Sequence, residues 1–93
     1  MFVHIVMKGY NLIDDRGMPH GPVRAKPIGV HLLADRAIEQ IRNYDFSVDM
    51  KRHDCTGFKE GVETSESRVC TLINGDRNDC NVKVWLTSEE ITL

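Results

Sequence analysis

One imidazole and three thiols in this chain could together hold a metal ion. They are His53, Cys55, Cys70 and Cys80, and a nitrogen donor with three thiolates is a ligand set of structural zinc sites. Zinc ribbons and fingers hold the ion with closely spaced cysteine pairs, whereas here each cysteine stands alone. We therefore predict buried free thiols, no metal and no cofactor, and keep a zinc-stabilised module as the second alternative function.

A second pattern resembles the start of a calcium-binding loop. Asn74, Asp76 and Asn78 alternate as the first ligands of such a loop do. The required glycine is replaced by Asp79, and the required bidentate glutamate by Trp85. We therefore interpret the segment as a solvated loop between two strands.

Cys55 is a candidate for a catalytic nucleophile. It lies two residues from His53 and close in sequence to Lys51 and Arg52, and such neighbours can favour the thiolate. No motif for stabilising an oxyanion accompanies it. We therefore predict that the protein is not an enzyme.

Basic residues occur in two groups that could meet in the fold. One group lies in a segment rich in glycine and proline, and the other follows a predicted strand; they comprise Arg16, His20, Arg24 and Lys26, and Lys51, Arg52 and His53. A patch of this kind binds phosphate when its cations share one face. The first alternative function is therefore a nucleic-acid-binding accessory protein that uses Arg16, Arg24, Lys26, Lys51 and Arg52.

A protein contact is the leading hypothesis. Trp85 alternates with Val82, Val84 and Leu86 and so lies on the opposite face of its strand, and exposed tryptophans often dominate protein interfaces. Residues 10–27 are dense in turn-forming residues, and long surface loops often bind partners. The predicted contact residues are Trp85, Asp14, Asp15, Arg16, His20 and Arg24.

The elements that must position these residues are mostly strands. Strands are predicted at residues 2–8, 28–33, 46–52, 67–73 and 81–86, with a hairpin tip or surface loop at 10–27, a loop at 54–66, a long turn at 74–80 and a tail from 87 that frays. In the first strand we expect Val3, Ile5 and Met7 to face the core.

One helix is expected, from Arg36 to Asn43, with Asp35 as its N-cap and a buried stripe of Ala37, Ile38 and Ile41. A single longer helix over 30–43 fits the spacing as well. Pro27 and Gly29 favour the strand at 28–33, because both are poor residues for a helix start at that point.

Length and composition place these elements in one domain. The chain has 93 residues, 41% hydrophobic and 28% charged, with a net charge of −2, which is ordinary for a folded protein and argues against a wholly basic nucleic-acid binder. Residues 1–53 carry eight basic and six acidic residues, and residues 54–93 carry four and eight.

The predicted fold is therefore α+β, a small antiparallel sheet of four to five strands with one helix packed on one face, in a single domain 1–93. No signal peptide or apolar span is evident, so we expect a soluble, cytoplasmic protein without a membrane contact. The predicted function is stoichiometric binding of another macromolecule, foremost a protein, as a regulator, inhibitor or accessory subunit. A homodimer is a further expectation, since the edges of a small sheet recruit partners.

Overall fold

The structure, a computed structural model, describes residues 1–14 and 16–92, apart from the side chains of residues 22, 62 and 63. This part of the chain forms, in order, β1 (Phe2–Ile13), β2 (Pro19–His31), α1 (Ala34–Arg42), α2 (Ser47–Arg52), β3 (Gly57–Thr64), β4 (Ser67–Asn74) and β5 (Arg77–Glu90). The fold class is α+β, as predicted, but two helices replace the single helix that was expected.

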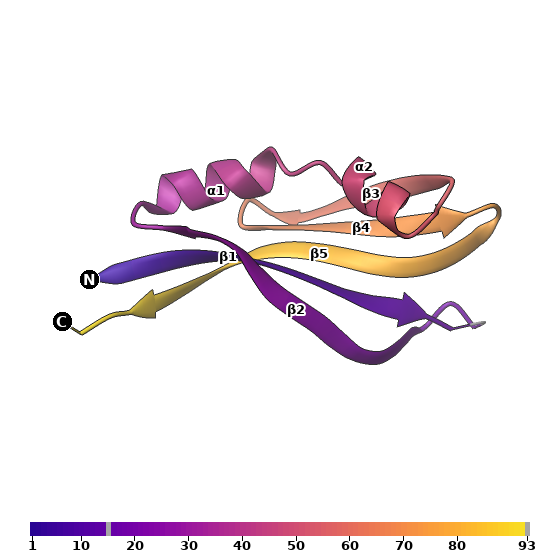
Figure 1. Ribbon diagram of the computed structural model, residues 1–93, viewed down its shortest axis with the longest axis horizontal. Coiled ribbons are helices and arrows are strands. Elements are labelled where there is room, and N and C mark those ends of the chain that lie inside the picture. Colours follow the sequence, from indigo (N-terminus) through magenta and orange to yellow (C-terminus); the bar gives the residue numbers. More distant parts are fainter. Residues whose placement is uncertain (15, 93) are drawn as a thin grey trace.

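Within the described residues the strands form one antiparallel sheet of five, in the order β2-β1-β5-β4-β3. Both helices lie on the same face of this sheet, and both ends of the chain lie at one end of the molecule (Figure 1). The molecule measures 49 × 25 × 22 Å, and its radius of gyration is 14.4 Å. A compact chain of this length would have a radius of gyration of about 12 Å, so this molecule is elongated. The helices cover one face of the long sheet (Figure 1).

The core lies between the two helices and the middle strands. Its buried members are Val6, Ala37, Ile41, Phe46, Cys55, Cys70, Leu72, Cys80, Val82 and Val84. Val6 belongs to this cluster, so the helices cover the alternate set of β1 that also holds Lys8 and Tyr10. Val3, Ile5 and Met7, which were predicted to face this core, lie on the other face of β1, where Val3 is buried outside this cluster and Ile5 and Met7 are half-buried. β1 carries apolar residues on both faces, so its alternation alone could not choose between them.

The β1–β2 hairpin is longer than the sequence indicated. The predicted irregular segment 10–27 is mostly paired strand, and only the residues around Asp14 to Met18 connect the two strands. Asp14 Oδ1 accepts hydrogen bonds from the backbone N–H groups of Arg16 and Met18, both at 2.9 Å. Gly17 adopts a left-handed conformation there, with φ 79°, so side-chain capping and one glycine close the turn.

α1 begins earlier than predicted. Its N-cap position is Leu33, which makes no side-chain cap, and Asp35 lies instead in the first turn, where a carboxylate favours the helix dipole. Ala37 and Ile41 are buried as expected, and Ile38 is half-buried. The strand before this helix reaches His31, which supports the shorter of the two helices considered.

α2 was missed, because residues 46–52 were predicted as a strand. Phe46, Val48 and Met50 alternate, but Val48 is exposed. The buried positions are Phe46 and Asp49, with Met50 packed against the core, and a spacing of three and four is helical. Asp49, a polar residue that the alternation assigns to solvent, is fully buried.

Three further boundaries differ from the prediction. The expected loop at 54–66 contains β3, an edge strand whose polar side chains can face solvent. The long turn at 74–80 is a two-residue turn around Gly75, because Asn74 pairs with Arg77. β5 continues to Glu90 and pairs there with Phe2, so the expected frayed tail is largely strand.

β2, at one edge of the sheet, contains all three prolines of the chain, Pro19, Pro22 and Pro27. Proline cannot donate a ladder hydrogen bond, so it discourages another strand from pairing along that edge.

Among the described residues, no helix is both long and apolar enough to cross a membrane.

Candidate functional site: a cationic groove

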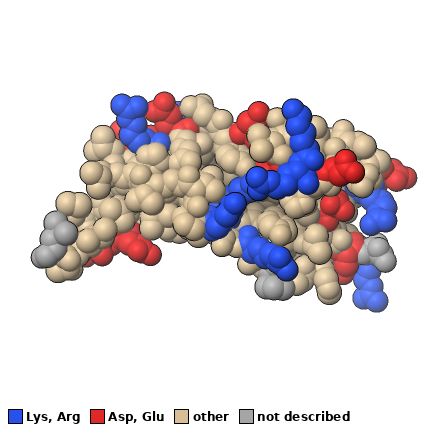
Figure 2. Space-filling view, in the orientation of Figure 1, with Lys and Arg blue, Asp and Glu red and all other residues tan. Residues whose placement is uncertain are grey.

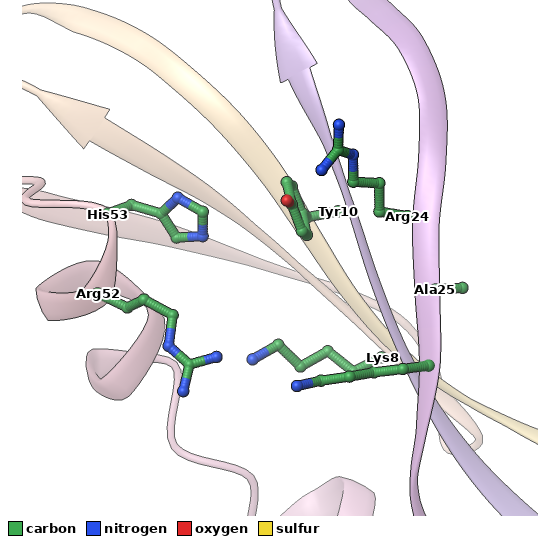
Figure 3. A pocket seen from close by; sticks show the side chains of 7 residues that line it. Lys8, Tyr10, Arg24, Ala25, Arg52 and His53 are labelled. Atoms are coloured by element: carbon green, nitrogen blue, oxygen red, sulfur yellow. The ribbon is translucent and has the colours of Figure 1, made fainter.

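A groove separates β2 from the end of α2, on the face of the sheet that carries the helices. It encloses a hollow of about 380 Å³. Its lining residues are Lys8, Tyr10, Arg24, Ala25, Lys26, Arg52 and His53. Figure 3 shows Arg52 and His53 pointing toward Lys8 and Tyr10, with Arg24 on the opposite side. Within the described chain this lining contains four lysines and arginines and no aspartate or glutamate.

The pairing of β1 with β2 builds the floor and one wall. Tyr10 lies opposite Arg24, and Lys8 opposite Lys26, and directly opposed residues of an antiparallel pair share one face of the sheet. The two wall cations therefore stand two residues apart on the same side of β2. That side faces the helices, because Lys8 contacts α2.

The end of α2 supplies the other wall. The N–H of Cys55 donates to the carbonyl of Met50 at 2.9 Å, and the N–H of Asp54 donates to the carbonyl of Lys51 at 3.2 Å. Together with a φ of 56° at Asp54, these bonds form a Schellman motif, in which the left-handed position usually holds glycine. The motif ends the helix after Arg52.

This helix end directs His53 toward the groove. The imidazole packs edge-on against the Tyr10 ring, with ring centroids 5.3 Å apart. The contact joins the helix wall to the floor, so His53 holds a defined position relative to β1. It also explains why His53 and Cys55 point to different surroundings, although they are two residues apart.

Lys8 is anchored beneath the groove by a buried carboxylate. Its ammonium forms an ion pair with Asp49 Oδ1, and Tyr44 donates a 2.6 Å hydrogen bond to Asp49 Oδ2. Burial works to lower the pKa of Lys8, but the hydrogen bonds and charge attraction of Asp49 and Tyr44 outweigh it and leave that pKa raised above 10.5. Burial first, and then the bond to Asp49, raises the pKa of the Tyr44 hydroxyl as well.

The remaining cations give the groove its positive charge. Asp49 compensates Lys8 and so relieves the repulsion between Lys8 and its opposite neighbour Lys26. In the described part of the chain, no carboxylate forms an ion pair with Arg24, Lys26 or Arg52. Lysine and arginine side chains gather across the middle of the face seen in Figure 2, with acidic side chains mainly to either side.

A second hollow continues the groove along β2. It has a volume of about 360 Å³ and shares Tyr10, Arg24 and His53 with the first. His20 adds a second imidazole to its lining. The two hollows therefore form one path along the strand, with the tyrosine ring where they meet.

The structure brings together only some of the basic residues that the sequence predicted. Arg24, Lys26 and Arg52 line the groove, whereas Arg16 and Lys51 are exposed and belong to none of its lining. Arg16 is at the tip of the β1–β2 hairpin, and Lys51 is on another side of α2. The two basic groups therefore do meet in the first hollow, but only through Arg24 and Lys26 of the first and Arg52 and His53 of the second, with Lys8 added from β1.

The residues predicted for a protein contact are dispersed. Trp85 lies on the sheet face away from the helices, half-buried over Gly9. Asp14 caps the hairpin turn, and Asp15 lies outside the described residues. His20 and Arg24 line the groove, so this set does not form one surface.

The four candidate zinc ligands are not gathered into a site. Among the described residues, no group of three or more histidine, cysteine, aspartate or glutamate side chains is placed to hold a metal. All three cysteines are free and buried. Burial is the largest cause that raises the thiol pKa of Cys70 to about 11 and that of Cys80 to about 12.

The surroundings of Cys55 do not activate its thiol. Burial, and then the nearby carboxylate of Asp79, raises its pKa. Its sulfur lies 3.7 Å from Asp79 Oδ2 and 3.7 Å from the carbonyl of His53. These neighbours favour the neutral thiol, which is the opposite of the activation considered from the sequence.

Two groove residues, Lys8 and Tyr10, escaped the sequence analysis. Both belong to the alternate set of β1 that contains Val6, and assigning that set to the helix-covered face would have found them.

Comparison with known proteins adds no relative: no family model, no curated protein and no solved structure matches the chain.

Proposed function

We propose that the protein binds nucleic acid stoichiometrically, holding backbone phosphates in the groove between β2 and α2. The observation that carries this proposal is the convergence of Arg24, Lys26 and Arg52 on one hollow without a described acidic residue in its lining. Phosphate oxygens are the partners that arginine and lysine clusters bind most often in nucleic-acid complexes.

The arrangement favours a polymer with repeated charges over a single small anion. Three cations that lack an ion-pair partner among the described carboxylates line the path. Binding three phosphates of a single strand would give a slope of about −2 for log affinity against log salt concentration, since each contact contributes about −0.7.

The test compares groove cations with matched cations outside the groove. Arg24→Ala, Lys26→Ala and Arg52→Ala should each weaken binding of a fluorescent oligonucleotide and make the salt slope shallower by about 0.7. Arg16→Ala and Lys51→Ala remove the same charge from positions outside the lining and serve as controls. Equal losses for the groove variants and the two controls would refute the groove as the binding site.

A protein partner is a second candidate, supported by exposed apolar side chains at one end of the molecule. Phe2, Val30, Leu32 and Leu33 are each exposed by more than half, from 55% to 68%. Strand pairing places the first two near the end of the β1–β2 ladder, and the others follow β2 directly. Partner binding at this end should be insensitive to salt and should be lost in Leu33→Ser. The same variant should bind the oligonucleotide as tightly as the native protein does.

A further inference from the structure

The aromatic floor of the groove indicates which form of nucleic acid it takes. We propose that the groove binds a single strand, with one unpaired base stacked on the ring of Tyr10 and the flanking phosphates on Arg24, Lys26 and Arg52. This inference rests on the proposed function and adds the class of ligand.

The first step is the position of the ring. Tyr10 belongs to β1, between a wall formed by β2 and a wall formed by the end of α2, as Figure 3 shows. A ring recessed between two walls can be reached by a base that projects from a flexible strand. The bases of a duplex are already stacked and paired, so their faces cannot enter.

The second step is the fixed orientation of the ring. His53 packs edge-on against it at 5.3 Å, and the strand opposite contributes Arg24. A ring held by neighbours on the protein loses little conformational freedom when a base stacks on it. Aromatic rings beside cations are the usual composition of single-strand grooves, where the ring binds the base and the cations follow the backbone.

The third step is the length of the path. The two adjoining hollows, of about 380 Å³ and about 360 Å³, meet at Tyr10. A strand can therefore enter along Lys26 and leave past His20 with the ring between the two ends. A free mononucleotide would fill one hollow and leave the other empty, so the continuous path favours an oligonucleotide.

The experiment measures fluorescence anisotropy with three labelled probes of equal length: single-stranded oligo-dT, a duplex, and an abasic deoxyribose-phosphate strand. The full chain should bind oligo-dT more tightly than either of the other probes, by roughly five- to 150-fold against the abasic strand if one base stacks. Tyr10→Leu should weaken oligo-dT binding by a similar factor and leave abasic binding unchanged. Tyr10→Phe, which keeps the ring, should bind oligo-dT within about twofold of the native protein.

The abasic probe makes the test independent of any loss of folding in Tyr10→Leu, since it needs only the native protein. If oligo-dT and the abasic strand bind equally well, and binding still depends on Arg24 and Lys26, the stacking inference is wrong and the phosphate groove stands. Tighter binding of the duplex than of oligo-dT would overturn the single-strand inference as well. If none of the three probes binds, the proposed function itself fails.

Discussion

Loss of the buried ion pair between Lys8 and Asp49 should strongly lower the stability of the fold. The two side chains are 11% and 1% exposed, and Asp49 has no other described partner for its Oδ1. Lys8→Met keeps the length of the side chain and removes its charge. It leaves a fully buried carboxylate opposite an apolar group, and removing one partner of a buried pair costs about 3–5 kcal/mol.

Asp49→Asn should cost less, about 1–3 kcal/mol. The reason is geometric: Lys8 borders the groove, so its ammonium can turn toward water, whereas Asp49 has no such route. The removal of a negative charge beneath the groove should also strengthen oligonucleotide binding in this variant. Lower stability with higher affinity is a combination that general unfolding would not produce.

The assay is thermal and urea unfolding followed by circular dichroism. For a chain of this size each 1 kcal/mol lowers the melting temperature by roughly 4–8 °C, so Lys8→Met should melt roughly 12–40 °C below the native protein. Arg36→Met is the matched control, because Arg36 forms an exposed pair with Glu39 at 3.7 Å, with side chains 69% and 60% exposed. Its expected cost is at most about 0.5 kcal/mol.

The double variant Lys8→Met/Asp49→Asn completes the cycle. Because each single change leaves the other partner uncompensated, the double variant should be more stable than the sum of the two losses implies, by about 2 kcal/mol. A Lys8→Met variant as stable as Arg36→Met, or two losses that simply add, would show that the pair does not stabilise the fold and would refute the reasoning.

Three further predictions concern other parts of the fold. Arg68 donates hydrogen bonds of 2.7, 3.0 and 2.9 Å to carbonyls at the end of α1 and in the following turn. Arg68→Ala should therefore lower the free energy of unfolding by about 3 kcal/mol or more in urea titrations. A variant as stable as the native protein would contradict this role of Arg68. A Cβ at Gly9 would lie 2.9 Å from Trp85 Cη2, so Gly9→Ala should cost about 1–3 kcal/mol and shift the emission of the single tryptophan to the red; an unchanged spectrum would count against this packing. The thiol pKa is raised to about 11 at Cys70 and to about 12 at Cys80, whereas thiols of the unfolded chain titrate near 9.0 and so lose their protons first. The contribution of these thiols to the free energy of unfolding should therefore be fully present below pH 9 and fall above it by up to about 1.4 kcal/mol per pH unit for each thiol. This slope should be shallower in Cys70→Ala/Cys80→Ala, and an identical slope would exclude the thiols as its cause.

Local patterns in the sequence predicted part of the fold. The strands at 2–8, 67–73 and 81–86 and the buried helical stripe of α1 follow from strand alternation and helical spacing. These signals are local and strong, because each depends on neighbouring residues along one element. The α+β class follows from them, and so does the placement of Trp85 opposite Val82 and Val84.

The same patterns failed where two periods fit the same residues. Phe46, Val48 and Met50 alternate like a strand, but in the fold Phe46, Asp49 and Met50 turn toward the core and the segment is helical. β1 carries apolar residues on both faces, so its buried face depends on which side the helices cover. Both choices are made by packing between distant segments, which a local pattern does not contain.

The candidate site shows the same division. From the sequence alone came the residue types, two groups of basic side chains far apart in the chain, and the expectation that they could meet. Only the tertiary structure decided that Arg24, Lys26 and Arg52 share a groove while Arg16 and Lys51 do not, and it added Tyr10 as the floor. The physical reason is that the register of β1 with β2 and the Schellman end of α2 set the direction of each side chain, and both depend on contacts between segments far apart in the sequence.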